Sequence, residues 1–148
     1  MLESMDMVAH IDSLGEPILV GPERAELAAW ASATADKTAP CPSWSAGVQH
    51  YRCNDHFIVR KQKRLGDLVE LRARTRELMD ELMPNLEKLD GMIERPDAVN
   101  GKVSLDDIRV LPLLRSAAVV KGLRFPEKVR NYFETMMTQI GYQPLPAV

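Results

Sequence analysis

The strongest constraint on the fold is a row of apolar residues at helical spacing in the middle of the chain. Neighbouring members lie three, four or seven positions apart, and mostly polar and charged residues fill the positions between them. Side chains at such spacings share one face of an α-helix. The row predicts one long amphipathic helix over residues 67–93, kinked at Pro84, because a proline removes one backbone hydrogen bond. The apolar members are Leu68, Leu71, Leu78, Leu82, Leu86, Leu89 and Ile93.

The other segments are helical in period too, and strand-like alternation is almost absent. The predicted fold is therefore all-α: a mostly antiparallel bundle of about five helices, preceded by one short helix on a linker. Proline, glycine and capping signals place the further helices at residues 5–14, 22–39, 54–65, 104–121 and 126–140. The domain boundaries that follow are 1–15 for the short helix, 16–22 for the linker, 23–143 for the bundle and 144–148 for a tail.

Ser104 begins one predicted helix with a complete local signal. Serine is a preferred N-cap, and Asp107 can accept a hydrogen bond from the Ser104 N–H, which makes a capping box with aspartate in place of glutamate. Val103 and Ile108 flank the box as a hydrophobic staple. Because the box satisfies N–H groups that a helix start leaves unpaired, this start can be buried. The expected inward face of the helix is Ile108, Leu111, Leu114 and Ala118.

Composition excludes several classes of protein. The chain of 148 residues is 45% hydrophobic and 27% charged, which is typical of one globular domain. Its net charge of −2 argues against a generally basic nucleic-acid binder. No apolar run is long enough for a membrane span, and the first residues do not resemble a secretory signal. Two cysteines are too few for a disulfide scaffold, so the expected compartment is the reducing cytoplasm.

The two cysteines do not form a recognisable reactive pair. Cys41 and Cys53 are too far apart in sequence for a C-x-x-C motif, and no nearby charge favours a thiolate, so we interpret them as unpaired thiols. His50 and His56 flank Cys53 at spacings of three, which could bring several zinc ligands together. The spacing matches none of the usual zinc patterns, and we therefore predict no metal site.

A basic stretch at residues 60–64 is the strongest local charge, and Arg72, Arg74 and Arg76 continue it. An acidic partner or a nucleic acid is one interpretation. Aromatic residues are not interleaved with these charges, so base stacking has no support. We favour the other interpretation, a solvated helical face beside a buried stripe.

Longer motifs give this sequence a family resemblance. The chain resembles the two-domain bacterial glutaredoxin 2 family, in which a thioredoxin-fold domain precedes an all-helical domain of the glutathione-transferase C-terminal type. The capping box alone indicates only the wider superfamily, whereas the set of motifs is more specific. The motifs are Glu3-Ser4-Met5-Asp6-Met7-Val8, Arg95-Pro96-Asp97-Ala98-Val99-Asn100-Gly101, Ser104-x-x-Asp107-Ile108, Leu111-Pro112-Leu113-Leu114-Arg115, Lys121-Gly122-Leu123 and Phe125-Pro126-x-x-Val129-x-x-Tyr132.

One part of the family pattern is missing from this chain. The family carries a Cys-Pro-x-Cys redox pair and a cis-proline loop in its first domain, and neither occurs here. The resemblance places Met1 inside that domain, so that residues 1–15 correspond to its final helix. An expressed fragment, an internal start codon and a truncated reading frame all remain open explanations. We therefore predict no catalytic residue in the chain.

The resemblance also implies a glutathione-binding pair at the start of the first helix. In glutathione-binding thioredoxin folds, an acidic residue followed by serine or aspartate holds the γ-glutamyl end of glutathione, which here corresponds to Glu3 and Ser4. A helix N-terminus favours a carboxylate, and the Glu3 carboxylate can pair with the ligand ammonium. The competing interpretation is that Ser4 only caps the helix.

Together these observations predict the helical domain of a glutathione-dependent thiol-disulfide oxidoreductase, which forms one wall of the active-site cleft. In the complete protein the resemblance implies glutathione as co-substrate and protein or mixed disulfides as partners, with no metal, nucleic acid or membrane. The alternative is a non-enzymatic helical protein-interaction module. In either case the former interdomain surface, once exposed, is expected to promote self-association.

Overall fold

The structure, a computed structural model, describes residues 4–38, 59, 62–63 and 66–143. Helices make up its regular structure, and the described part of the chain contains no strand beyond one isolated bridge between Arg95 and Ala98. The predicted all-α fold is confirmed. The helices are α1 (Ser4–Asp12), α2 (Ala25–Thr38), α5 (Leu68–Ala73), α6 (Thr75–Met92), α7 (Leu105–Ala118) and α8 (Glu127–Gln139).

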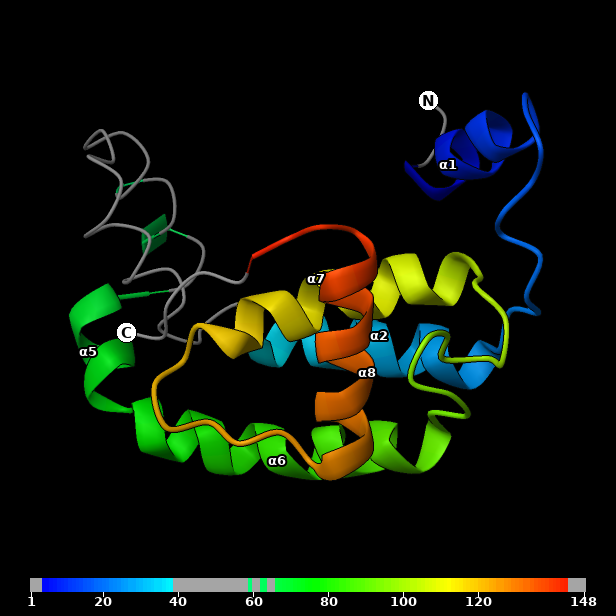
Figure 1. Ribbon diagram of the computed structural model, residues 1–148. Helices are drawn as coiled ribbons and strands as arrows, with labels where there is room; N and C mark the ends of the chain where they lie inside the picture. The colour runs from blue at the N-terminus through cyan, green and yellow to red at the C-terminus, as the bar shows by residue number, and fades with distance from the viewer. Residues whose placement is uncertain (1–3, 39–58, 60–61, 64–65, 144–148) are drawn as a thin grey trace.

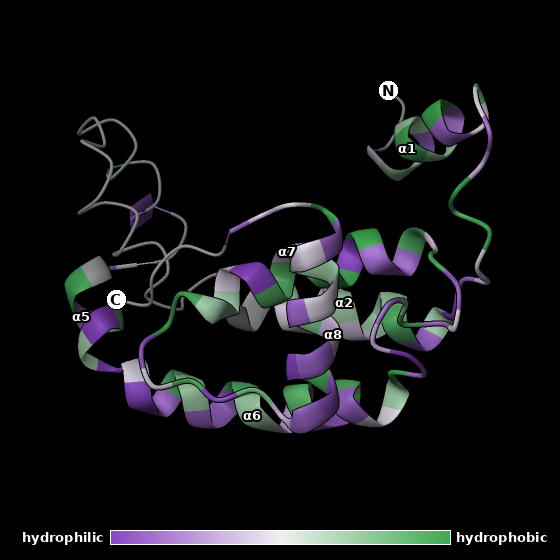
Figure 2. Cartoon of the chain, viewed as in Figure 1, coloured by the Kyte–Doolittle hydropathy of each residue, from purple (hydrophilic) through white to green (hydrophobic). Residues whose placement is uncertain are grey.

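Four helices, α2, α6, α7 and α8, enclose a single apolar core (Figure 1). The apolar row predicted from the sequence supplies the α6 side of this core: Leu82 and Leu89 are fully buried, and Leu86 almost so. Both α6 and α8 alternate between hydrophilic and hydrophobic residues around their axes (Figure 2), as helices buried on one side do. Trp30 of α2 joins the core and donates its indole N–H to the Asn85 carbonyl at 2.7 Å.

The single long helix predicted over residues 67–93 is wrong. Two helices, α5 and α6, replace it, with the break at Arg74 (φ −90°, ψ 13°), while Pro84 lies inside α6. The apolar row itself contains the reason, because seven positions separate Leu71 from Leu78 and the residues between them are mostly polar. Because this stretch has no large apolar side chain to bury, packing does not hold the two segments in one continuous helix.

Helix α7 faces the core with only part of the expected set of residues. Val110, Leu114 and Ala117 are buried, whereas Ile108 is 36% exposed. Leu111 and Ala118 are only half-buried at the edge of the core. The expected face was therefore wrong by part of a turn. In this orientation the carboxylates of Asp106 and Asp107 at the N-terminus of the helix are buried, where they have hydrogen-bond partners inside the protein.

Helix α2 begins at Ala25, later than the predicted start at Pro22. The backbone groups at positions 22 and 24 have partners in the bundle instead: the Pro22 carbonyl accepts from the Asn100 side chain, and the Arg24 N–H donates to Asp106. Residues 21–24 thus form an anchored segment, and the first turn of α2 begins only after it.

Helix α1 lies apart from the bundle at the N-terminal end of a linker (Figure 1). None of its residues is buried. No helix in the described ranges is both long and apolar enough to cross a membrane. The expectations for Cys41, His50, Cys53 and His56, and for the tail at residues 144–148, concern residues outside the described part of the chain.

Candidate functional site

The predicted glutathione pair falls at the free end of α1. Glu3 lies outside the described residues, and Ser4 is the first residue of α1, where its side chain is exposed. Ser4 therefore lies in the first described turn of α1, at the helix start that the sequence predicts. The N–H groups of a first helical turn have no intrahelical acceptor, so this end of α1 can bind an anion.

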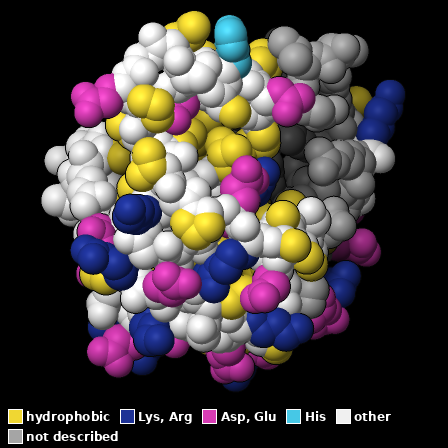
Figure 3. Space-filling view, turned by 90° about the vertical axis from the view of Figure 1, so that its right-hand side faces the viewer, with side chains coloured by type: hydrophobic (Ala, Val, Ile, Leu, Met, Phe, Trp, Pro, Cys, Tyr) yellow, Lys and Arg dark blue, Asp and Glu magenta, His cyan; other side chains and the backbone are white. Residues whose placement is uncertain are grey.

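The apolar face of α1 is uncovered. On α1, Ile11 is 68% exposed and Met7 is also exposed, and Leu14, in the turn just after the helix, is 73% exposed. Ile18 and Val20 extend the exposed apolar surface along the linker. Figure 3 shows hydrophobic side chains gathered in the upper half of this face of the molecule. A face of this kind usually contacts another protein surface.

The first half of the linker folds back on α1. The Asp12 carboxylate accepts from the backbone N–H of Ile18 at 2.9 Å and from that of Leu19 at 3.3 Å. Ser13 also bonds back to α1, with its N–H on the Ala9 carbonyl. Residues 4–19 consequently form one locally bonded segment.

The second half of the linker is fixed to the bundle, beginning at Gly21. The Gly21 N–H donates to the Val103 carbonyl at 2.8 Å. A Cβ atom at this position would lie 2.2 Å from the Lys102 carbonyl oxygen, a distance that no side chain tolerates. Glycine is therefore required here because the two backbones approach each other closely.

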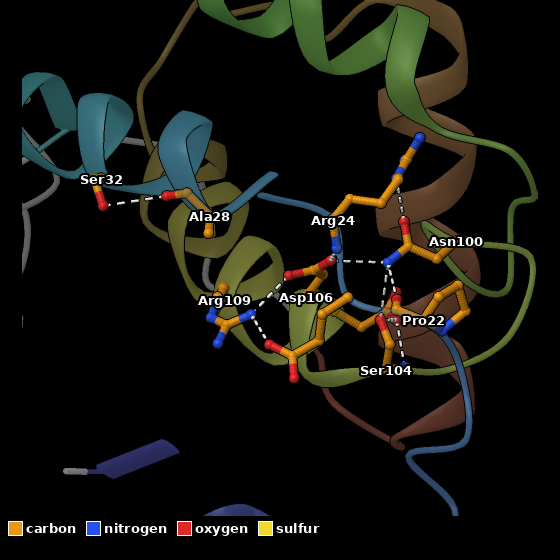
Figure 4. Close-up of polar contacts among 10 residues, drawn as sticks. Pro22, Arg24, Ala28, Ser32, Asn100, Ser104, Asp106 and Arg109 are labelled. Carbon is orange, nitrogen blue, oxygen red and sulfur yellow. Dashed lines mark hydrogen bonds and ion pairs between the residues drawn. The ribbon is translucent and has the colours of Figure 1, made fainter. Parts of the chain in front are cut away.

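Buried polar side chains hold the next three residues (Figure 4). Asp106 is fully buried and accepts from the Arg24 N–H at 2.7 Å and from the Asn100 amide at 2.8 Å. The same Asn100 amide donates to the Pro22 carbonyl at 2.6 Å, while its oxygen accepts from the Arg24 guanidinium at 2.7 Å. Asp106 thus binds the backbone of Arg24, and Asn100 binds its side chain.

Arg109 completes this arrangement from α7. It donates to the buried Asp106 carboxylate and to Glu23 in the linker, both at 2.7 Å. The hydrogen bond to Glu23 raises the pKa of the Arg109 guanidinium, which therefore stays charged. A buried carboxylate is stable only when it is paired and hydrogen-bonded, and Asp106 has three donors. We call the group Arg24, Asn100, Asp106 and Arg109 the linker clamp.

The neighbouring Asp107 organises the helix start. The capping box with Ser104 is present: the Asp107 carboxylate accepts from the Ser104 N–H at 2.8 Å. It also accepts from the Val99 N–H and from the Tyr132 hydroxyl, each at 2.8 Å. Burial, together with the Asp107 carboxylate, raises the pKa of Tyr132 well above its ordinary value, so the hydroxyl remains a donor. The flanking Val103 is half-buried, and Ile108 lies on the exposed side.

The structure describes only part of the basic stretch, in which Arg72, Arg74 and Arg76 are exposed, as a solvated helical face requires. Lys63 is exposed, and Arg74 is paired with Glu77 at 2.8 Å, which lowers the pKa of the Glu77 carboxyl. Residues 60, 61 and 64 lie outside the described part. Within the described ranges no three histidine, cysteine or acidic side chains come together as a metal site.

The sequence interpretation missed the linker clamp. Asn100 was noted only as part of a motif, and Arg24 and Asp106 were not singled out. The acidic pair Asp106-Asp107 was the available signal, because only one of two adjacent carboxylates can serve the capping box. The other needs a different set of donors if the helix start is buried.

The described helices form a bundle of the glutathione-transferase C-terminal class, joined through the linker clamp to a separate helix. Residues 46–144 match the family described as "Glutaredoxin 2, C terminal domain". Glutaredoxin 2 of Escherichia coli K12 is 31% identical over 146 residues, which cover 94% of this chain and 68% of that protein. The chain belongs to the glutaredoxin 2 family.

A solved relative extends the likeness to the whole structure. The crystal structure of glutaredoxin 2 from Salmonella typhimurium in complex with glutathione matches with a TM-score of 0.82 at 28% identity. The match covers 98% of this chain and 70% of that one. So little of the chain is left uncovered that the likeness must include much of α1 as well as the bundle.

Proposed function

We propose that this chain is the helical part of a glutathione-dependent thiol-disulfide oxidoreductase of the reducing cytoplasm. Its bundle forms one wall of the active-site cleft. The chain contains no Cys-Pro-x-Cys sequence, and in our proposal a thioredoxin-fold domain outside these 148 residues supplies that redox pair. The observation that carries the proposal is the likeness to a glutathione-bound glutaredoxin 2, because it extends beyond the bundle to α1.

Helix α1 is the proposed link between the bundle and the thioredoxin-fold domain. Its uncovered apolar face suits packing against the sheet of a thioredoxin-fold domain, since helices of that kind bury one side. In the assembled protein the N-terminal end of α1 then lies beside the active site. There Ser4 offers a hydroxyl and the helix N-terminus offers free N–H groups to the γ-glutamyl carboxylate of glutathione, and Glu3 pairs with its ammonium group.

Activity measurements test this proposal in two parts. The chain alone, assayed with glutathione and a small mixed disulfide, is expected to give no turnover above buffer. A fusion that places the thioredoxin-fold domain of a glutaredoxin 2 before residue 1 is expected to be active, and Ser4→Ala in the fusion should raise the KM for glutathione. Turnover by the chain alone that disappears in Cys41→Ser or Cys53→Ser would refute the proposal, as would a folded but inactive fusion.

The exposed apolar face also favours a second candidate, a non-enzymatic interaction module. In that case the face of Ile11 and Leu14 binds a partner protein directly. The fusion separates the two candidates, because the first requires the added domain to cover this face. If the fused domain folds but leaves α1 free in solution, the second candidate is the better account.

A further inference from the structure

The linker changes its bonding partners at a single residue. Hydrogen bonds of residues 13–19 stay within α1 and the linker itself, whereas residues 21–24 bond to the bundle. Val20 stands between the two sets, 61% exposed, and no hydrogen bond of the described part involves it. The chain therefore has a locally bonded unit on one side of Val20 and an anchored one on the other.

The anchored side is held at every position. Gly21 bonds to Val103, Pro22 to Asn100, Glu23 to Arg109, and Arg24 to Asp106. In addition, the Arg24 guanidinium donates to the Met92 carbonyl and forms an ion pair with Glu94 at 3.6 Å. The loop before α7 and the first turn of α7 thus bind four consecutive residues, none of which is buried.

We propose that Asn100 and Asp106 are positioning residues, which fix where residues 4–19 leave the bundle and so confine the motion of α1 to a hinge at Val20. Asn100 bridges the Pro22 carbonyl and Asp106, and Asp106 accepts from the Arg24 N–H. These bonds fix the direction of the chain on the bundle side of Val20. Under the proposed function the same clamp sets the orientation of the redox domain against the cleft wall, but the inference itself concerns only α1 and the bundle.

Distances between spin labels test this inference in the chain itself. Labels at Ala9→Cys in α1 and Asn131→Cys in α8, both exposed positions, report the placement of α1 in a Cys41→Ser, Cys53→Ser background. Asn100→Ala is expected to broaden this distance distribution and shift its mean. Asp97→Asn is the matched control, because Asp97 lies in the same loop and pairs only with exposed Arg95 among the described contacts. It should leave the distribution as it is.

Two further measurements separate positioning from loss of the fold. A second label pair at Glu87→Cys and Asn131→Cys lies within the bundle, on α6 and α8, and should keep its width in Asn100→Ala. Val20→Gly leaves the clamp intact and is expected to broaden only the α1 distribution, because glycine adds backbone freedom. The proposal is overturned if Asn100→Ala and Val20→Gly both leave the distance distribution between the labels on α1 and α8 unchanged. Equal broadening of the bundle pair in Asn100→Ala overturns it too, since Asn100 would then serve the fold alone.

Discussion

The two ends of the linker show opposite kinds of surface. At the bundle end, charged and polar side chains are buried, yet within the described residues every buried side-chain nitrogen or oxygen has a hydrogen-bond partner. At the other end, α1 is amphipathic but leaves its apolar side in solvent. The polar groups of the bundle are therefore satisfied within it, while the sequence of α1 suits a surface that the described part of the chain does not provide.

This comparison predicts that loss of Asp107 has the largest effect on stability. Asp107→Ala removes the acceptor of two buried backbone N–H groups and of the Tyr132 hydroxyl. Each unpaired buried donor costs about 1–3 kcal/mol, so for three donors we expect a loss of about 3 kcal/mol or more. Denaturant unfolding measures it. Asp97→Ala, at a half-buried aspartate near the same helix start whose ion-pair partner is the exposed Arg95, should leave the midpoint unchanged, and a similar loss in both variants would contradict the role given to Asp107.

Tyr132→Phe should have the next largest effect, and it should depend on pH. The variant loses one hydrogen bond to a charged group, which typically contributes about 1.5–3 kcal/mol. Because the pKa of Tyr132 is raised on folding, its contribution is complete below the unfolded value near 10 and declines as pH rises above it. The wild type should therefore lose more stability above about pH 10 than the variant does.

Unfolding free energies at neutral and alkaline pH check this prediction. Tyr142→Phe is the matched control, since Tyr142 is half-buried and its ring lies 5.3 Å from the Arg115 guanidinium. That change keeps the ring and should have the smaller effect. If the unfolding free energies of wild type and Tyr132→Phe decline equally at alkaline pH, the buried hydroxyl does not contribute to the pH dependence of stability.

Ser104→Ala should cost less than either change. The Ser104 hydroxyl donates to Asp107 and accepts from Asn100, but the Asn100 amide retains the Pro22 carbonyl and Asp106. We therefore expect about 0.5–2 kcal/mol, the usual range for an N-cap. Ser32→Ala on the exposed side of α2 is the control and should stay within about 0.5 kcal/mol. A Ser104→Ala change no larger than the control would remove the capping box from the account.

Substitutions on α1 and in the turn after it should have the smallest effect on stability and a clear one on association. In the pair Ile11→Ser and Leu14→Ser, two exposed side chains become polar, so the unfolding midpoint of the bundle should not move. Sedimentation at rising concentration is expected to show dimers or small aggregates in the wild type and fewer in the double variant. Ile140→Ser, at an exposed isoleucine after α8, is the control and should not reduce association. A strictly monomeric wild type would contradict the prediction.

Local patterns predicted much of the fold. The period of the leucine row gave the buried face of α6, and the Ser104 and Asp107 spacing gave the start of α7, because both signals involve residues close in sequence. The linker clamp could not be derived in this way. Arg24 meets Asn100 and Asp106 across 76 and 82 positions, and no periodicity indicates which of many charged residues will meet.

Amide hydrogen exchange tests most directly the claim that the bundle is self-sufficient and α1 is not. The account predicts fast exchange at residues 8–12, because a helix of nine residues, none of them buried, is marginal in water. It predicts slow exchange at residues 82–89, which open only with the whole bundle. Equal protection of the two segments in a monomeric sample would contradict the account, since α1 would then be a packed part of the domain.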